Sequence, residues 1–188
     1  ENEYYSIGLS TPGLIPNGDR TVFMQISKHE SAHVGFLKST LTSLGTTPGN
    51  KPTFDFTASG NFSPFTDYSQ FLILAQAFED TGVRAYKGQA GNLISTPDLL
   101  TAALQIHSVE ARHASEVRRL RGLKGWISGN ERGAGMPVET QAVYNGEELT
   151  VQAGYNTATL FGAAAGSEAY DEPLTTQQVV DIANLFIV

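Results

Sequence analysis

The sequence contains no cysteine, which excludes disulfides, thiol nucleophiles, iron–sulfur clusters and cysteine-based zinc sites. Positive charge is also scarce, because 12 Lys and Arg residues against 19 Asp and Glu residues leave a net charge of −7. We expect no nucleic-acid partner, since such proteins usually present a basic face. No stretch approaches the roughly 20 apolar residues of a membrane span. What is present is 40% hydrophobic residues in a chain of 188, enough for one sizeable core.

One short pattern, Glu-x-x-His, occurs twice in the chain. The first copy runs from Glu30 to His33 and the second from Glu110 to His113. Both copies fall where a helix should present apolar residues to a core, and Glu79 interrupts a third apolar series in the same way. Buried carboxylates are costly unless a cation compensates their charge. The pattern therefore predicts that these five side chains bind metal.

Hydrophobic spacing predicts helices at residues 20–44, 67–93 and 97–123, and residues 1–9 as the end of a first helix whose start is cut off. Apolar positions recur every three or four residues in the three longer stretches, which is the spacing of a bundle core. In the second helix the expected core face is Val22, Ile26, Glu30, His33, Leu37, Leu41 and Leu44. Asp19 is the predicted N-cap of this helix.

Distances along the chain bring the polar core positions to one level. Glu79 lies 15 residues before the turn centred on Ile94, and Glu110 lies 16 residues after it. Glu30 and Glu1 stand 15 and 14 residues from the turn that precedes the second helix. Glu1 is therefore a candidate fourth carboxylate. The arrangement matches the bundle plan in which two helices each give a Glu and two each give Glu-x-x-His.

Residues 46–66 form an unusually long connection for a compact domain, and three prolines prevent it from continuing a helix. A crossover along a bundle would span roughly 40 Å at ~1.5 Å per helical residue. An extended loop of 21 residues reaches up to about 70 Å. We therefore predict an all-α fold, an up-down-down-up four-helix bundle with a truncated first helix.

Residues 126–188 differ in character, with frequent glycine and alanine. Residues 142–144 and 149–151, on either side of Asn145-Gly146, predict a small hairpin, and residues 175–186 predict a short amphipathic helix. We expect this extension to wrap the bundle, which gives a bundle domain of residues 1–125 and an extension of residues 126–188.

Other charged residues have plainer interpretations. Asp67 and Asp80 are expected to be solvated or to cap helices. The cations late in the fourth helix suit the negative end of the helix dipole, and we do not interpret them as a binding patch; they are Arg112, Arg118, Arg119, Arg121 and Lys124.

The stretch from His29 to His33 also matches H-E-x-x-H, the signature of zinc peptidases. In that interpretation both histidines bind zinc and Glu30 is the general base, with Glu79 as a third ligand that the sequence does not exclude. The interpretation leaves the second Glu-x-x-His without a role.

Four runs carry a resemblance to a known family: KHESAHVGFL, FEDTGVRAY, SVEARHASEVR and EAYDEPLTTQQV. Together they resemble the ferritin-like, desiccation-related and stress-induced proteins of fungi, bacteria and plants. The resemblance implies a ferritin-like bundle and metal ligands at Glu30, His33, Glu79, Glu110 and His113. The family's first helix is longer, so its ligand is either Glu1 or a residue upstream. Many members are exported, which suggests a secreted or cell-surface protein.

Two functional hypotheses follow from these residues. In the first, two iron or manganese ions make the protein an oxidoreductase that acts on oxygen, peroxide or an organic substrate. In the second, the protein is a non-catalytic stress protein whose site is structural or sequesters metal. A small-molecule oxidant is the partner that the first hypothesis requires, and a homo-oligomer is compatible with both.

Overall fold

The computed structural model describes residues 1–188, and the chain is mostly helical with one small sheet, as predicted. Two compact units make up the chain, and each is described by itself. The first unit contains residues 1–74 and 183–188, and the second contains residues 75–182. None of the helices combines the length and the apolar character that crossing a bilayer requires.

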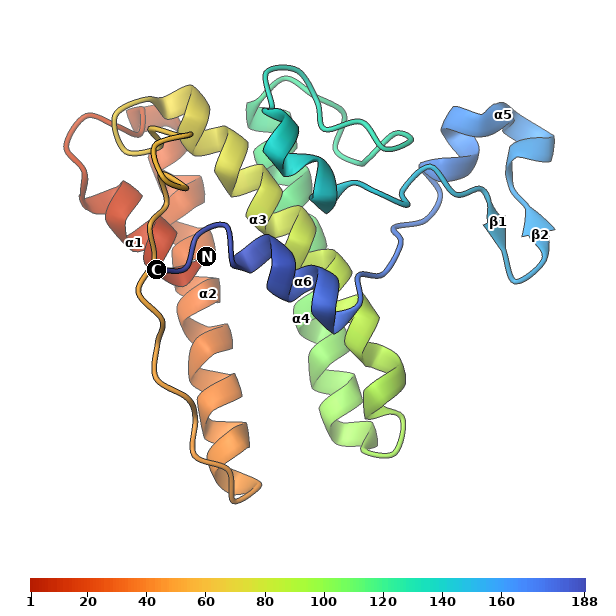
Figure 1. Cartoon of the computed structure of the whole chain (residues 1–188), viewed down its shortest axis with the longest axis horizontal. Coiled ribbons are helices and arrows are strands. Elements are labelled where there is room, and N and C mark those ends of the chain that lie inside the picture. The colour runs from red at the N-terminus through yellow and green to blue at the C-terminus, as the bar shows by residue number, and fades with distance from the viewer. The chain divides into compact units, whose positions relative to one another are not determined.

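The first unit begins with α1 (Asn2–Ser10) and α2 (Asn17–Ser43), and it includes the start of α3 (Tyr68–Gln89) (Figure 1). The prediction that Asp19 caps α2 was wrong. The helix starts earlier, with Pro16 at the N-cap position and Asp19 inside the first turn. There the Asp19 carboxylate accepts a 2.7 Å hydrogen bond from the Tyr68 hydroxyl, so it ties α2 to α3.

Aromatic rings form the core of the first unit. Tyr4 stacks on Phe71 with ring centroids 4.9 Å apart, and Phe23 meets Phe71 edge-on at 5.1 Å. The buried Tyr4 hydroxyl donates a 2.8 Å hydrogen bond to the Phe71 carbonyl, and burial raises its pKa well above the ordinary value. Gly8 lets α1 lie close to Phe71, because a Cβ there would stand 2.4 Å from the ring.

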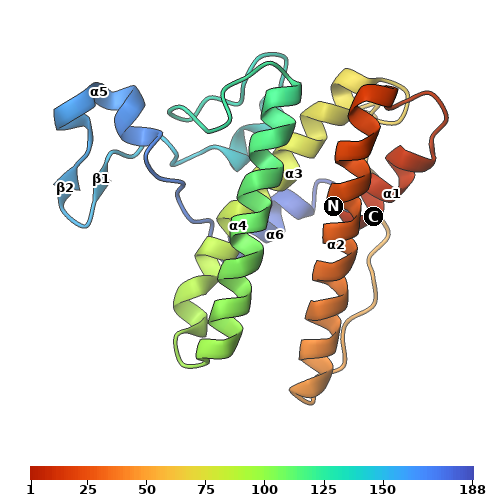
Figure 2. The ribbon, with the colours of Figure 1, turned by 180° about the vertical axis from the view of Figure 1, so that it is seen from behind.

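Residues 46–66 return along α2 in both views, as a crossover should (Figures 1 and 2). The predicted core face of α2 was wrong in its second half, because Leu37, Leu41 and Leu44 are 42%, 39% and 61% exposed. The returning segment is itself mostly exposed up to Thr53 and does not cover them. Its aromatic end instead pairs with the C-terminal segment, where Phe54 forms an antiparallel bridge with Ile187.

The second unit is built on the rest of α3, a 3-10 turn η1 (Ala90–Leu93) and α4 (Pro97–Leu120). α3 and α4 lie side by side in both views and run in opposite directions (Figures 1 and 2). Pro97 begins α4, as the predicted helix over residues 97–123 does, and Thr96 stands at its N-cap position. The helix stops at Leu120, and Gly122 follows in the left-handed region at φ 72°, a conformation that favours glycine.

The extension contains η2 (Val138–Val143), β1 (Val151–Gln152), β2 (Tyr155–Asn156), α5 (Ala158–Ser167) and α6 (Thr176–Ala183). A hairpin exists, but its predicted position was wrong. β1 and β2 pair around Ala153 and Gly154, whose φ angles of 49° and 85° give the left-handed turn that tight hairpins need. The predicted first strand instead coils as η2.

Buried charges attach the extension to α3. Arg84 is 1% exposed, and its Nε lies 2.7 Å from the Glu147 carboxylate and donates to the Glu172 carbonyl. Its two terminal nitrogens donate to the Val143 and Asn145 carbonyls. The buried guanidinium needs these carbonyls as hydrogen-bond acceptors. The backbone at residues 143–145 therefore curves around Arg84, which explains why η2 is found where a strand was predicted.

Candidate metal centre

Two elements of the second unit, α3 and α4, position a group of three buried metal-capable side chains. Glu79 on α3 is fully buried, and Glu110 and His113 on α4 are 1% and 5% exposed. Glu110 and His113 are three residues apart, so helix geometry places them one turn apart on the same face. That face is the one at which the apolar spacing of α4 predicts a core, because Ile106 and Val117 on either side are buried too.

The side-chain atoms of this group lie close together. The Nδ1 atom of His113 lies 3.2 Å from an oxygen of Glu79 and 3.3 Å from an oxygen of Glu110. Each of the three residues offers one ligand atom, and these atoms all lie within 4.8 Å of one another. Two carboxylates this close in a buried place repel each other unless a proton or a metal cation lies between them. The group could hold a metal, as predicted.

The other Glu-x-x-His copy lies on α2 in the first unit. Glu30 is 2% exposed although it is a carboxylate in the middle of a helix, and His33 is half-buried. The Nδ1 atom of His33 lies 3.4 Å from a Glu30 oxygen, so this pair repeats the contact between His113 and Glu110. Both copies of the motif therefore have the same local arrangement, and in both the carboxylate is the more buried partner.

Glu1 differs from the other candidate ligands. It stands at the N-cap position of α1, where its backbone carbonyl accepts a 3.0 Å hydrogen bond from the Tyr5 amide. The residue is exposed, unlike Glu30, Glu79 and Glu110. Its assignment as a ligand stays a prediction.

The histidine that the zinc-peptidase interpretation requires, His29, lies one turn before His33 on α2. Its Nε2 atom is 2.7 Å from the Gln25 side-chain nitrogen, a partner on the preceding turn of the same helix. The residue is half-buried, whereas Glu30 beside it is buried. The motif is thus helical, as a zinc-binding H-E-x-x-H must be, and that interpretation stays an untested alternative.

The prediction that Asp80 is solvated or caps a helix was wrong, because it pairs with Arg118, which lies in the last turn of α4 as expected. Both side chains are 3% exposed, and two guanidinium nitrogens of Arg118 donate to the two Asp80 oxygens at 3.2 and 2.5 Å. The buried Tyr144 hydroxyl also donates to Asp80 at 2.8 Å. Only Asp67 keeps the predicted role, accepting from the Ser69 amide at the start of α3.

This polar group, which sequence reasoning missed, fixes α3 next to the candidate ligands. Asp80 follows Glu79 directly, so its bonds to α4 and to the extension restrict how α3 can rotate. Gln76, one turn earlier, donates to the Tyr144 hydroxyl at 2.9 Å. The sequence offered one indication of this group, because Asp80 and Arg118 lie beside the predicted core faces. It gave no indication that the two side chains, 38 residues apart, pair with each other.

Comparison with known proteins agrees with the helical part of this description. Residues 1–123 match the family model described as a ferritin-like domain. The matched range includes α1 to α4 and every candidate ligand. No curated protein matches the chain.

Proposed function

Because this chain belongs to the ferritin-like domain family, we propose that it is a metal-dependent oxidoreductase whose buried carboxylates and histidines hold two iron or manganese ions. Its substrate in this proposal is oxygen or peroxide. The observation that carries the proposal is the convergence of Glu79, Glu110 and His113 within 4.8 Å in a buried place. No structural role of an apolar core calls for such a group.

The donor atoms support iron or manganese rather than a softer metal. Carboxylate oxygens and imidazole nitrogens are present, and the chain has no thiolate to offer. Two buried carboxylates also require positive charge close by, and the paired cation Arg118 is already used by Asp80. A divalent cation would supply that charge, so the residues fit the ion.

We assign the ligands by motif. Glu110 and His113 would hold one ion, and the matching pair Glu30 and His33 would hold the other. Glu79, with Glu1, would complete the set. Support comes from the repeated motif, from the burial of Glu30, and from the known bundle plan with Glu-x-x-His on two helices.

Bound iron or manganese would supply the one-electron redox chemistry that oxygen and peroxide require. The residues of the chain hold the ions, exclude bulk water and manage protons. In the metal-free protein, a proton on Nδ1 of His113 can be shared with the Glu79 and Glu110 oxygens at 3.2 and 3.3 Å. A ligand nitrogen must give up that proton, so metal uptake should release protons and weaken at low pH.

Elemental analysis of the purified and iron- or manganese-reconstituted protein tests the proposal. We expect about two ions per chain in the wild type and in Glu116→Gln, a control on the same helix outside the buried group. Glu110→Gln and His113→Ala should lose at least one ion, because each removes a ligand. A wild type that takes up no redox metal would contradict the proposal.

The alternatives give different results in the same set of experiments. A protein that only sequesters metal would bind iron without iron-dependent oxygen or peroxide consumption. A zinc peptidase would hold one zinc and cleave casein, and Glu30→Ala would abolish the cleavage. The stress-associated role and the export suggested by the family resemblance remain part of the proposal and need expression and localisation data.

A further inference from the structure

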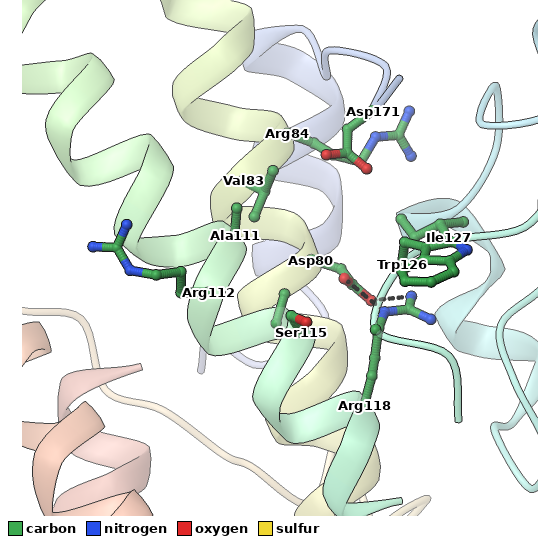
Figure 3. Close-up of a pocket in the computed structure, with 12 residues that line it drawn as sticks. Asp80, Val83, Arg84, Ala111, Arg112, Ser115, Arg118, Trp126, Ile127 and Asp171 are labelled. Carbon is green, nitrogen blue, oxygen red and sulfur yellow. Dashed lines mark hydrogen bonds and ion pairs between the residues drawn. The ribbon is translucent and has the colours of Figure 1, made fainter. Parts of the chain in front are cut away.

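A cavity of about 300 Å³ lies in the second unit, between α3, α4 and the start of the extension (Figure 3). Asp80, Val83 and Arg84 line it from α3, and they follow Glu79 by one, four and five positions. Helix geometry therefore places Val83 about 40°, and Asp80 and Arg84 about 100° and 140°, around α3 from that ligand. None of the candidate metal ligands lines the cavity, and the proposed function does not use it.

The positive charges around the cavity are already paired or turned away. Arg118 gives two donors to Asp80, as the dashed lines in Figure 3 mark. Arg84 directs its donors to Glu147 and to backbone carbonyls of the extension. Arg112 is exposed at the rim, and its side chain points away from the other labelled residues (Figure 3). No guanidinium is therefore left to receive an anion inside the cavity.

One carboxylate on the cavity wall accepts no hydrogen bond. Asp171 is half-buried and lies outside the salt bridges of the cavity, although its charge acts on the guanidiniums of Arg84 and Arg118. The ammonium of Lys87 donates to the backbone carbonyl of Asp171 at 2.5 Å, and Arg118 and Arg84 give their donors to Asp80, to Glu147 and to backbone carbonyls, so the Asp171 carboxylate oxygens remain available. Because Asp80 is neutralised by Arg118, Asp171 supplies the charge that a ligand in the cavity would meet.

The opposite wall is an aromatic ring. Trp126 is 52% exposed. The loop that carries Trp126 lies in close contact with α4 at Gly125, because a Cβ at that position would stand 2.6 Å from the Ser115 hydroxyl. Val83, Ala114 and Ile127 provide a buried apolar floor. An aromatic wall, an apolar floor and one carboxylate that accepts no hydrogen bond thus surround the cavity.

We propose that this cavity binds a small organic cation, a primary ammonium on a compact aromatic or alkyl body. The ammonium pairs with Asp171, and the body lies against Trp126 above the apolar floor. Aromatic faces attract organic cations, and a partly desolvated carboxylate strengthens the preference. A volume of about 300 Å³ is at the small end for ligand sites, so the ligand is a small one.

Trp126 is the only tryptophan in the chain, so its fluorescence reports on ligands that bind beside this ring, and the variants below assign them to this cavity. The experiment titrates the full chain with benzylammonium, benzyl alcohol and benzoate, which share a shape and differ in charge, at constant ionic strength. We expect a saturable change with benzylammonium, at least tenfold weaker binding of benzyl alcohol, and no saturation with benzoate. Comparable binding of benzoate, equal binding of benzyl alcohol, or no saturation by benzylammonium would each overturn the proposal.

Two variants locate the site. Asp171→Asn keeps the shape of the side chain and should weaken benzylammonium binding at least tenfold. Asp181→Asn removes the same charge from an exposed position on α6 and should leave binding unchanged. An equal loss in both variants would mean that net charge, rather than this cavity, attracts the ligand. The comparison of the three compounds on the wild type stands even if a variant folds poorly.

Discussion

Glu147 should make the protein less stable as the pH rises, although it forms an ion pair. The residue is 1% exposed. One of its oxygens lies 2.7 Å from Arg84 Nε and accepts the Glu172 amide at 2.8 Å, while the other has no hydrogen-bond partner. Burial raises the pKa of Glu147 from 4.5 to about 7, and the nearby Arg84 charge lowers it only in part.

The direction and the size of the effect follow from this pKa. The folded state binds the proton more tightly than the unfolded state, so the contribution of Glu147 to stability is full below pH 4.5. It is lost as the pH rises through 7. The difference between the two pKa values corresponds to at most about 3 kcal/mol of unfolding free energy. A variant with glutamine at this position, which stays neutral, should therefore have the same unfolding free energy as the wild type in acid and a higher one above pH 7.

Urea unfolding of the wild type and of Glu147→Gln at pH 5, 6, 7 and 8 measures this effect. The advantage of the variant should grow with pH to as much as about 3 kcal/mol. Glu148→Gln, a neutral replacement at the exposed neighbouring position, should show no such growth. If Glu147→Gln is destabilised equally at every pH, the Arg84 attraction outweighs the cost of burial and the reasoning is refuted.

Two further predictions concern the candidate ligands and the attachment of the extension. In metal-free protein, Glu110→Gln should raise the unfolding free energy by about 1 to 3 kcal/mol, because it removes a buried charge. With iron or manganese added, the wild type should become the more stable of the two, because only it keeps the full ligand set. Thermal unfolding of both proteins with and without metal measures this. Gly88→Ala should cost about 1 to 3 kcal/mol and speed proteolysis of the extension, because the new Cβ would stand 1.9 Å from the Leu174 carbonyl oxygen. Gly91→Ala, with nothing within 4 Å, is the control, and equal proteolysis of both variants would contradict the contact.

Local patterns were sufficient to predict much of the helical structure. The spacing of apolar residues gave the three long helices, and their observed limits differ from the predicted ones by a few residues. It also placed Glu79, Glu110 and His113 on buried faces, because helix periodicity alone decides which side chains share a face. The pairing of Glu110 with His113 depends only on their separation along α4 and could be predicted without a fold.

Features that depend on distant residues could not be predicted in this way. Asp80 looked like a solvated carboxylate until Arg118, 38 residues later, was seen to pair with it. The hairpin was expected five to nine residues too early, because the Val143 and Asn145 carbonyls accept hydrogen bonds from Arg84 and are not part of a strand. The exposed leucines at the end of α2 show the same limit, since periodicity predicts a face but not what covers it.

The sequence by itself determined the helices, their apolar faces and the metal-capable side chains on those faces, because these follow from local geometry and from the cost of burying charge. Tertiary structure alone decided which charges are paired. It pairs Asp80 and Glu147 with arginines, and it leaves Asp171 on the wall of a cavity beside Trp126. The physical reason is that the charge state and the partner of a side chain are set by the groups around it in space, and a linear pattern does not contain them.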